Sequence, residues 1–102
     1  MQEEKQPAVY IIANRYRGTT YIGVTSRLYD RINEHKNGSF QGFSSQYGLK
    51  ILVWYVHFET MQAAIKCEIQ IKVWKRDWKF ELIEKLNPNW LDLHERIEYR
   101  TE

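Results

Sequence analysis

One acidic residue, Glu68, lies in a stretch that otherwise predicts the buried face of a helix. On a helix that begins near Met61, Glu68 falls within the apolar arc of Ala64, Ile65, Ile69 and Ile71. Because burying an ionised carboxylate without a partner is strongly unfavourable, the group must be paired, protonated or bound to a cation. Lys72, four residues further on, could supply an ion pair. The alternative interpretation makes Glu68 a metal ligand.

Two tyrosines in a predicted hairpin are the next candidates for chemistry. Pairing Ala13 with Gly18 across the turn places Tyr10 opposite Tyr21, so that both phenols share one face of the sheet. Gly23 lies on that same face, and its missing side chain predicts a notch through which a substrate could approach. Ordinary cross-strand aromatic packing beside a small residue is the alternative.

Basic side chains recur at a spacing of four in a segment that predicts a helix. Arg27, Arg31 and His35 form one stripe, and Arg31 lies about 60° from the apolar Leu28 on the helical wheel. A guanidinium at the edge of the buried face could present its fork of donors to a phosphate. A solvated basic stripe, with His35 as a cation favoured by the helix dipole, is the alternative.

The strands that must position these residues are visible in the apolar pattern. Runs rich in β-branched and aromatic residues predict strands over residues 8–13, 19–24 and 49–58. The polar residues 14–18 predict a hairpin turn between the first two. Both faces of the third run are largely apolar, so helices are expected to cover the sheet on both sides.

Three helices are expected around this sheet. They span about residues 27–36, 61–74 and 77–86. Ser26 and Thr60 are the expected N-caps of the first two, and Asn37-Gly38 is the expected end of the first. The element order is therefore ββαβαα. The predicted fold class is α+β, a three-stranded antiparallel sheet flanked by helices.

Composition predicts one folded domain in the cytoplasm. A chain of 102 residues is too short for two independent cores, and 43% hydrophobic residues favour a packed globule. No apolar run approaches the ~20 residues that span a bilayer, and the N-terminus lacks the features of a signal peptide. Because Cys67 is the single cysteine, any metal must be held by oxygen or histidine ligands.

The charge distribution suits a polyanionic partner. Residues 6–91 carry twelve basic and seven acidic residues, a net charge of +5. A basic middle of this kind is typical of proteins that bind nucleic acid. A solvated surface next to an acidic C-terminal segment is the alternative.

Taken together, these residues resemble the GIY-YIG nuclease superfamily. Ala8-Val9-Tyr10 and Tyr21-Ile22-Gly23 are similar to its two name-giving tripeptides, and the tyrosines are 11 residues apart as in that family. Alanine and valine replace the glycine and isoleucine of the first tripeptide, at positions that concern strand packing. The resemblance is greatest to stand-alone, single-domain members. It covers about residues 8–93 as the domain, with residues 1–7 and 94–102 as terminal extensions.

The rest of the motif follows at the family's spacing. Arg31 and His35 correspond to the pair on the family's first helix, and Glu68 lies in a segment similar to its metal-binding helix. The implied activity is hydrolysis of phosphodiester bonds in DNA with a single divalent cation, Mg²⁺ or Mn²⁺, held by Glu68. Tyr10 would act as the general base or position the attacking water, with Tyr21 beside it, and Arg31 would neutralise charge on the scissile phosphate.

The implied partner is single- or double-stranded DNA, bound by a monomer or weak dimer. The candidate substrate-binding residues are Gly23, Arg27, Lys72, Lys75, Arg76 and Asn87. Asn87 is favoured over Asn89 as the family's asparagine near the domain end. Trp74, Trp78 and Tyr47 could stack on bases or belong to the core. DNA repair, restriction and mobile-element roles all use this domain, and the alternative function is a nucleic-acid-binding module that needs a partner for cleavage.

Overall fold

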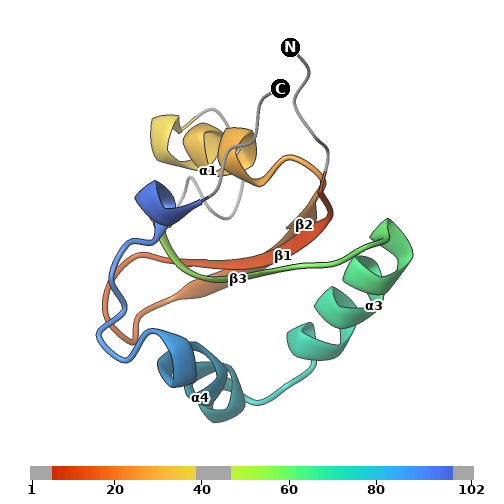
Figure 1. Cartoon of the computed structure of the whole chain (residues 1–102). Coiled ribbons are helices and arrows are strands. Elements are labelled where there is room, and N and C mark those ends of the chain that lie inside the picture. Colours follow the sequence, from red (N-terminus) through yellow and green to blue (C-terminus); the bar gives the residue numbers. More distant parts are fainter. Residues whose placement is uncertain (1–5, 39–46, 98–102) are drawn as a thin grey trace.

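The computed structural model describes residues 6–38 and 47–97. At its centre lies an antiparallel sheet of three strands, in the spatial order β2-β1-β3 (Figure 1). The strands are β1 (Ala8–Ala13), β2 (Thr20–Thr25) and β3 (Ile51–His57). The predicted strands are therefore confirmed, although β3 is shorter at both ends than its apolar run.

Helices cover both faces of this sheet. They are α1 (Leu28–Asn37), α3 (Met61–Lys72) and α4 (Arg76–Leu86), followed by the short 3₁₀ helix η1 (His94–Arg96). In Figure 1, α1 lies on one face and α3 and α4 lie on the other. The order ββαβαα and the α+β class are confirmed. Within residues 6–38 and 47–97, no helix is both long and apolar enough to cross a membrane.

The central strand β1 builds two cores because alternate residues point to opposite faces. All six of its residues are buried. Val9, Ile11 and Ala13 pack with buried residues of α3 and α4, whereas Ala8, Tyr10 and Ile12 pack on the side of α1. The second core includes Leu28 and Ile32, the apolar positions of α1. Tyr10 is therefore fixed beneath α1 by the pleat of the sheet.

The predicted register of the hairpin is wrong by two residues. Tyr10 pairs with Gly23, and Tyr21 pairs with Ile12. The strands separate earlier than expected because the Asn14 side chain accepts a hydrogen bond of 2.9 Å from the Thr19 amide, which closes a longer turn. Side chains alternate with a period of two, so Tyr10 and Tyr21 still share one face, diagonally rather than directly opposite.

The helix termini differ in part from the predicted caps. α1 begins after Arg27 without a side-chain cap, so Ser26 is not its N-cap. Instead, the Thr25 hydroxyl accepts a bond of 3.0 Å from the Arg27 amide. Gly38 ends α1 in the left-handed conformation, with φ of 71°, as expected. Thr60 caps α3 by accepting from the Ala63 amide at 3.1 Å, which is also as expected.

The segment after α4 holds α1 in place against the sheet. The Asp92 carboxylate accepts hydrogen bonds from the Leu52 and His94 amides at 3.2 and 3.0 Å, and it forms an ion pair with Lys36. The His94 ring stacks on Tyr29 with a centroid separation of 5.1 Å and meets Asn33 Oδ1 through Nε2 at 2.9 Å. These contacts fix the orientation of α1 and of the side chains that it carries.

Candidate functional site

The centre of the site is a contact between Tyr10 on β1 and His35 on α1. The phenol oxygen of Tyr10 lies 3.0 Å from Nε2 of His35, and both side chains are buried. Tyr21 completes a cluster of three rings, with centroids 6.5 Å from Tyr10 and 5.9 Å from His35. The hairpin tyrosines and the last turn of α1 therefore meet in one place.

Gly23 makes room for this cluster. A Cβ atom at Gly23 would lie 2.4 Å from both Cζ and the hydroxyl oxygen of Tyr10. The expected notch beside Gly23 is consequently filled by the Tyr10 ring, which is only 1% exposed. Gly23 lies at the site as predicted, but it accommodates a tyrosine of its own chain.

Arg31 lies next to the phenol oxygen of Tyr10. Its charge acts on that phenol and lowers the pKa of Tyr10, and its guanidinium forms a 3.5 Å ion pair with Glu34 one turn along α1. The Tyr10 hydroxyl can donate its proton to Nε2 of His35 when that nitrogen is unprotonated. The side chain of Arg31 is 38% exposed, so solvent reaches it.

The site holds both Tyr10 and His35 in their neutral forms. Burial is the largest cause that raises the pKa of Tyr10 well above its ordinary value, and the neighbouring Tyr21 and Glu68 act in the same direction against the opposing effect of Arg31. Burial, and then the charge of Arg31, lower the pKa of His35 to about 4. At neutral pH a protonated phenol therefore faces a neutral imidazole ring.

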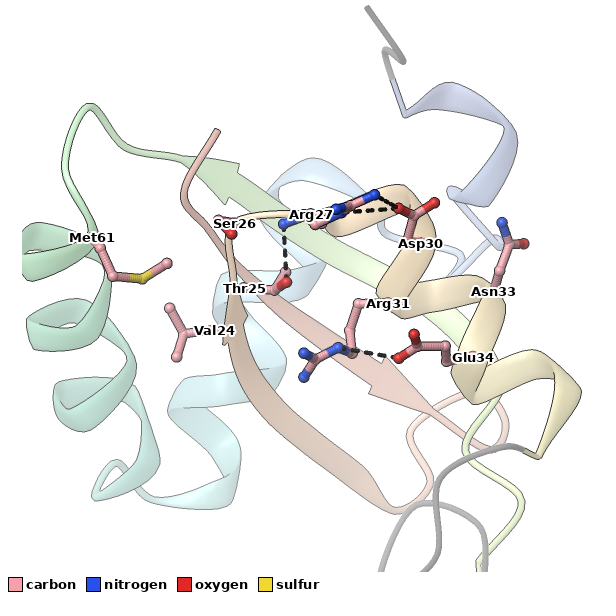
Figure 2. Close-up of a pocket in the computed structure, with 9 residues that line it drawn as sticks. All are labelled: Val24, Thr25, Ser26, Arg27, Asp30, Arg31, Asn33, Glu34 and Met61. Carbon is pink, nitrogen blue, oxygen red and sulfur yellow. Dashed lines mark hydrogen bonds and ion pairs between the residues drawn. The ribbon is translucent and has the colours of Figure 1, made fainter. Parts of the chain in front are cut away.

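An open groove of about 680 Å³ runs beside this cluster. It is lined by Val24, Thr25, Ser26, Arg27, Asp30, Arg31, Asn33, Glu34 and Met61 (Figure 2). Figure 2 shows α1 on one side of the groove, Met61 of α3 on the other, and the end of β2 between them. Arg31 is thus the residue that joins the buried Tyr10 to a space large enough for a substrate.

Glu68 approaches the site from α3. Its carboxylate is close enough to Tyr10 for its charge to raise the pKa of that phenol. The side chain is 13% exposed and pairs with Lys72 at 3.1 Å, so the ion pair considered from the sequence is present. The apolar arc was misplaced, because Ile65 and Ile69 are exposed while Ala64 and Ile71 are buried. Glu68 therefore lies at the rim of the buried face.

The donor set at Glu68 fits a hard divalent cation whose remaining ligands come from water and phosphate. Within the described residues there is no group of three or more histidine, cysteine or acidic residues that could hold a metal ion. Mg²⁺ is usually bound by one or two carboxylates together with substrate oxygens, so a single carboxylate that is 13% exposed is consistent with it. A cation there would replace the Lys72 ammonium.

Some of the predicted substrate-binding residues lie elsewhere or have other partners. Arg27 lines the groove but pairs with Asp30 at 2.8 Å. Arg76 donates at 2.9 Å to the carbonyl of Arg17 in the hairpin turn, at the opposite end of β2 from the groove, and Lys75 precedes it at the N-cap of α4. The structure thus places these two basic residues away from the phenol cluster.

Asn87 has a structural place in the fold. Its amide group donates to the carbonyls of Val53 and Leu91 at 3.0 and 2.9 Å, and its carbonyl accepts from the Leu91 amide at 3.0 Å. The side chain is buried and joins the end of α4 to β3. Its polar atoms serve the fold and do not line the groove.

The aromatic residues considered for stacking on bases are divided between surface and interior. Trp78 and Tyr47 are 54% and 47% exposed, whereas Trp74 is partly buried. The two tryptophan rings meet edge to face with centroids 6.0 Å apart.

Of the nine groove residues, only Arg27 and Arg31 were predicted from the sequence, and Glu34 and Met61 are two of those that were missed. Glu34 pairs with Arg31, and Met61 forms the wall on α3. The spacing of three between Arg31 and Glu34 is the signal that could have identified the first. Met61 carries no comparable signal, because its contact with the groove depends on how α3 packs on the sheet.

Comparisons with known proteins identify the family of this chain. The family model of the GIY-YIG catalytic domain matches residues 6–81. The chain is 32% identical over 82 residues to a UPF0213 protein of Vibrio campbellii (strain ATCC BAA-1116), a match that covers 80% of this chain and 78% of that protein. No solved structure gives a significant match. The chain therefore belongs to the GIY-YIG family.

Proposed function

We propose that this protein is a metal-dependent endonuclease that hydrolyses phosphodiester bonds in DNA. Proteins with this domain are generally endonucleases. The observation that carries the proposal is the convergence of the Tyr10–His35 contact and Arg31 beside an open groove, with the Glu68 charge acting on the same phenol. We assign the reaction to Tyr10, Tyr21, Arg31, His35 and Glu68.

Arg31 is the proposed phosphate ligand. It stays charged at every relevant pH and can bind two phosphate oxygens at once. In the free protein, Arg31 forms an ion pair with Glu34, and its charge also acts on the Tyr10 phenol. A phosphate in the groove would attract the guanidinium away from both, and this movement would uncover the Tyr10 oxygen for an attacking water.

The proposed proton acceptor is the pair of Tyr10 and His35. Because its pKa is raised, Tyr10 reacts as a neutral phenol and not as a stored phenolate. As the water oxygen bonds to phosphorus, its proton passes to the Tyr10 oxygen while the Tyr10 proton passes to Nε2 of His35. The phosphorus–ester bond breaks, and the leaving oxygen takes a proton from solvent. Tyr21 packs against both rings and keeps them in place.

Glu68 is the residue that would hold a divalent cation, and Mg²⁺ and Mn²⁺ match its oxygen donor. Such a cation supplies charge neutralisation at the phosphate. Lys72 keeps the carboxylate paired in the free protein, and its side chain is half exposed.

A second function, binding of nucleic acid without cleavage, is favoured by the Glu68–Lys72 ion pair. If that pair persisted in the complex, Glu68 would be a structural residue and cleavage would require a partner domain. The groove and Arg31 would still bind phosphate.

The experiment that tests the proposal is nicking of supercoiled plasmid with Mg²⁺ or Mn²⁺, run at several salt concentrations. We expect nicking by the wild type and a loss of about 100-fold or more in Arg31→Ala and Glu68→Ala. Lys85→Gln, an exposed lysine on α4, serves as the control. Equal nicking rates in the wild type and Glu68→Ala would contradict the proposal. DNA binding by a wild-type protein that does not nick would support the second function.

A further inference from the structure

Three exposed aliphatic side chains form a ridge along α3. Ile65, Ile69 and the C-cap residue Val73 are 41%, 57% and 80% exposed, and they recur every four residues. We call these three residues the α3 ridge. It is about 12 Å long at a rise of 1.5 Å per residue. Aliphatic side chains gathered in this way are unfavourable in water and typical of a surface that another molecule covers.

The α3 ridge begins at the proposed active site. Met61, which lines the groove, precedes Ile65 by four residues and so starts the same line along the helix. Glu68 lies close to that line on the side toward the sheet, where Ala64 and Ile71 are buried. A molecule with a phosphate in the groove would therefore extend along the ridge.

Charge along the ridge favours a polyanion. Lys66 and Lys72 are exposed on α3, and the single acid of that helix, Glu68, is already paired with Lys72. Because Lys72 and Glu68 balance each other, the positive charge beside the aliphatic side chains comes from Lys66, and α3 carries a net charge of +1. Duplex DNA matches this pattern in its minor groove, where two rows of phosphates border a narrow channel.

We propose that the α3 ridge enters the minor groove of double-stranded DNA beside the phosphate that Arg31 binds. A helix with its side chains is about 10–12 Å wide, whereas the minor groove is about 6 Å wide, so the helix body cannot enter undistorted DNA. The ridge side chains must therefore widen the groove. Aliphatic side chains inserted there unstack base pairs and kink the duplex. This inference rests on the proposed function, because it takes the groove to be the phosphate site.

The substrate class that follows is duplex DNA that is easily deformed. Flexible steps such as TA, and mismatched pairs, lower the energy needed to kink the helix. The protein should therefore bind a duplex with a central mismatch more tightly than the matched duplex or either single strand.

The test measures binding and base unstacking without a divalent cation, so that no cleavage occurs. The probe is a duplex with 2-aminopurine next to a central mismatch, whose fluorescence rises when the base unstacks. We expect the wild type to increase the fluorescence and Ile65→Ser/Ile69→Ser to abolish the increase and bind about tenfold or more weakly. Leu86→Ser, which changes a 73% exposed residue on α4, should behave as the wild type.

Several outcomes would overturn the inference. Unchanged affinity and fluorescence in the double variant would do so, as would a change only in its oligomeric state by light scattering, which would assign the ridge to self-association. Val73→Ser, at the most exposed position, repeats the test if circular dichroism shows that the double variant is unfolded. Failure of the proposed function is distinguishable, because ridge-dependent binding would then persist in a wild-type protein that never nicks plasmid.

Discussion

The ring of Tyr10 lies directly against Gly23, where a Cβ atom would meet the phenol Cζ and oxygen at 2.4 Å. Because β1 is the central strand and Tyr10 is only 1% exposed, the ring has no free space to move into. The glycine of the second tripeptide therefore sets the position of the tyrosine of the first. This relationship connects strand packing to the geometry of the Tyr10–His35 contact.

We expect Gly23→Ala to displace the Tyr10 ring, which would lower the free energy of unfolding by about 1–3 kcal/mol and reduce nicking. A double-mutant cycle with Tyr10→Leu checks the cause, since a smaller side chain removes the overlap. Urea unfolding should give a double variant that is more stable than the sum of the two single effects predicts. Additive effects would mean that Tyr10 is not the residue that requires glycine.

The protein should become less stable as the pH is lowered from 6.5 to 4, because in that range His35 is protonated in the unfolded chain but neutral in the folded protein. The pKa of His35 is about 4 in the folded protein and ordinarily 6.5, so the unfolded chain binds the proton first. This contribution to stability is intact above pH 6.5, declines between pH 6.5 and 4, and is fully lost below 4, with a total on the order of 3 kcal/mol.

His35→Gln is the variant that isolates this effect. The glutamine can still accept from Tyr10 but does not titrate. The difference in unfolding free energy between wild type and variant should change between pH 7 and 4, measured by urea unfolding at each pH. Parallel curves would show that His35 is not the group responsible.

The sequence predicts correctly which side chains share a face of the sheet, but it does not predict which residues pair between β1 and β2. Tyr10 and Tyr21 share a face because the period of two is unchanged by a shift of two residues. The register itself depended on Asn14, whose side chain closes the turn. A hydrogen bond that a turn side chain accepts from a backbone amide five residues away gives no periodic signal.

The sequence identified the site residues on α1 and α3, but it did not predict their contacts or their burial. His35 was selected by its spacing from Arg31, but its contact with Tyr10 joins a helix to a strand and depends on tertiary packing. On α3 the apolar pattern was broader than the buried face, because Ile65 and Ile69 are exposed. A helical wheel measures where apolar residues gather, and it cannot distinguish burial in the core from a surface that meets a partner.

Asn87→Ala should destabilise the protein and leave its active site intact. The substitution leaves the carbonyl of Val53 and both backbone groups of Leu91 without their side-chain partner. We expect the free energy of unfolding to fall by about 2–4 kcal/mol. Nicking per folded molecule at low temperature should equal that of the wild type. If the variant has normal stability but loses nicking, Asn87 is a substrate-binding residue and not a structural one.

Lys72→Gln should lower the concentration of Mn²⁺ or Mg²⁺ needed for half-maximal nicking. In the free protein the Lys72 ammonium lies 3.1 Å from a Glu68 oxygen, so it competes with a cation for the same carboxylate. Lys72 is half exposed, and ion pairs of this kind contribute up to about 1 kcal/mol, which corresponds to a shift of about two- to fivefold. Plasmid nicking across a metal titration gives the value, with Lys85→Gln as the matched loss of one positive charge. The ratio of the two half-maximal concentrations cancels any general weakening of DNA binding. A requirement for more metal in Lys72→Gln than in the control would show that the lysine assists the cation site and does not compete with it.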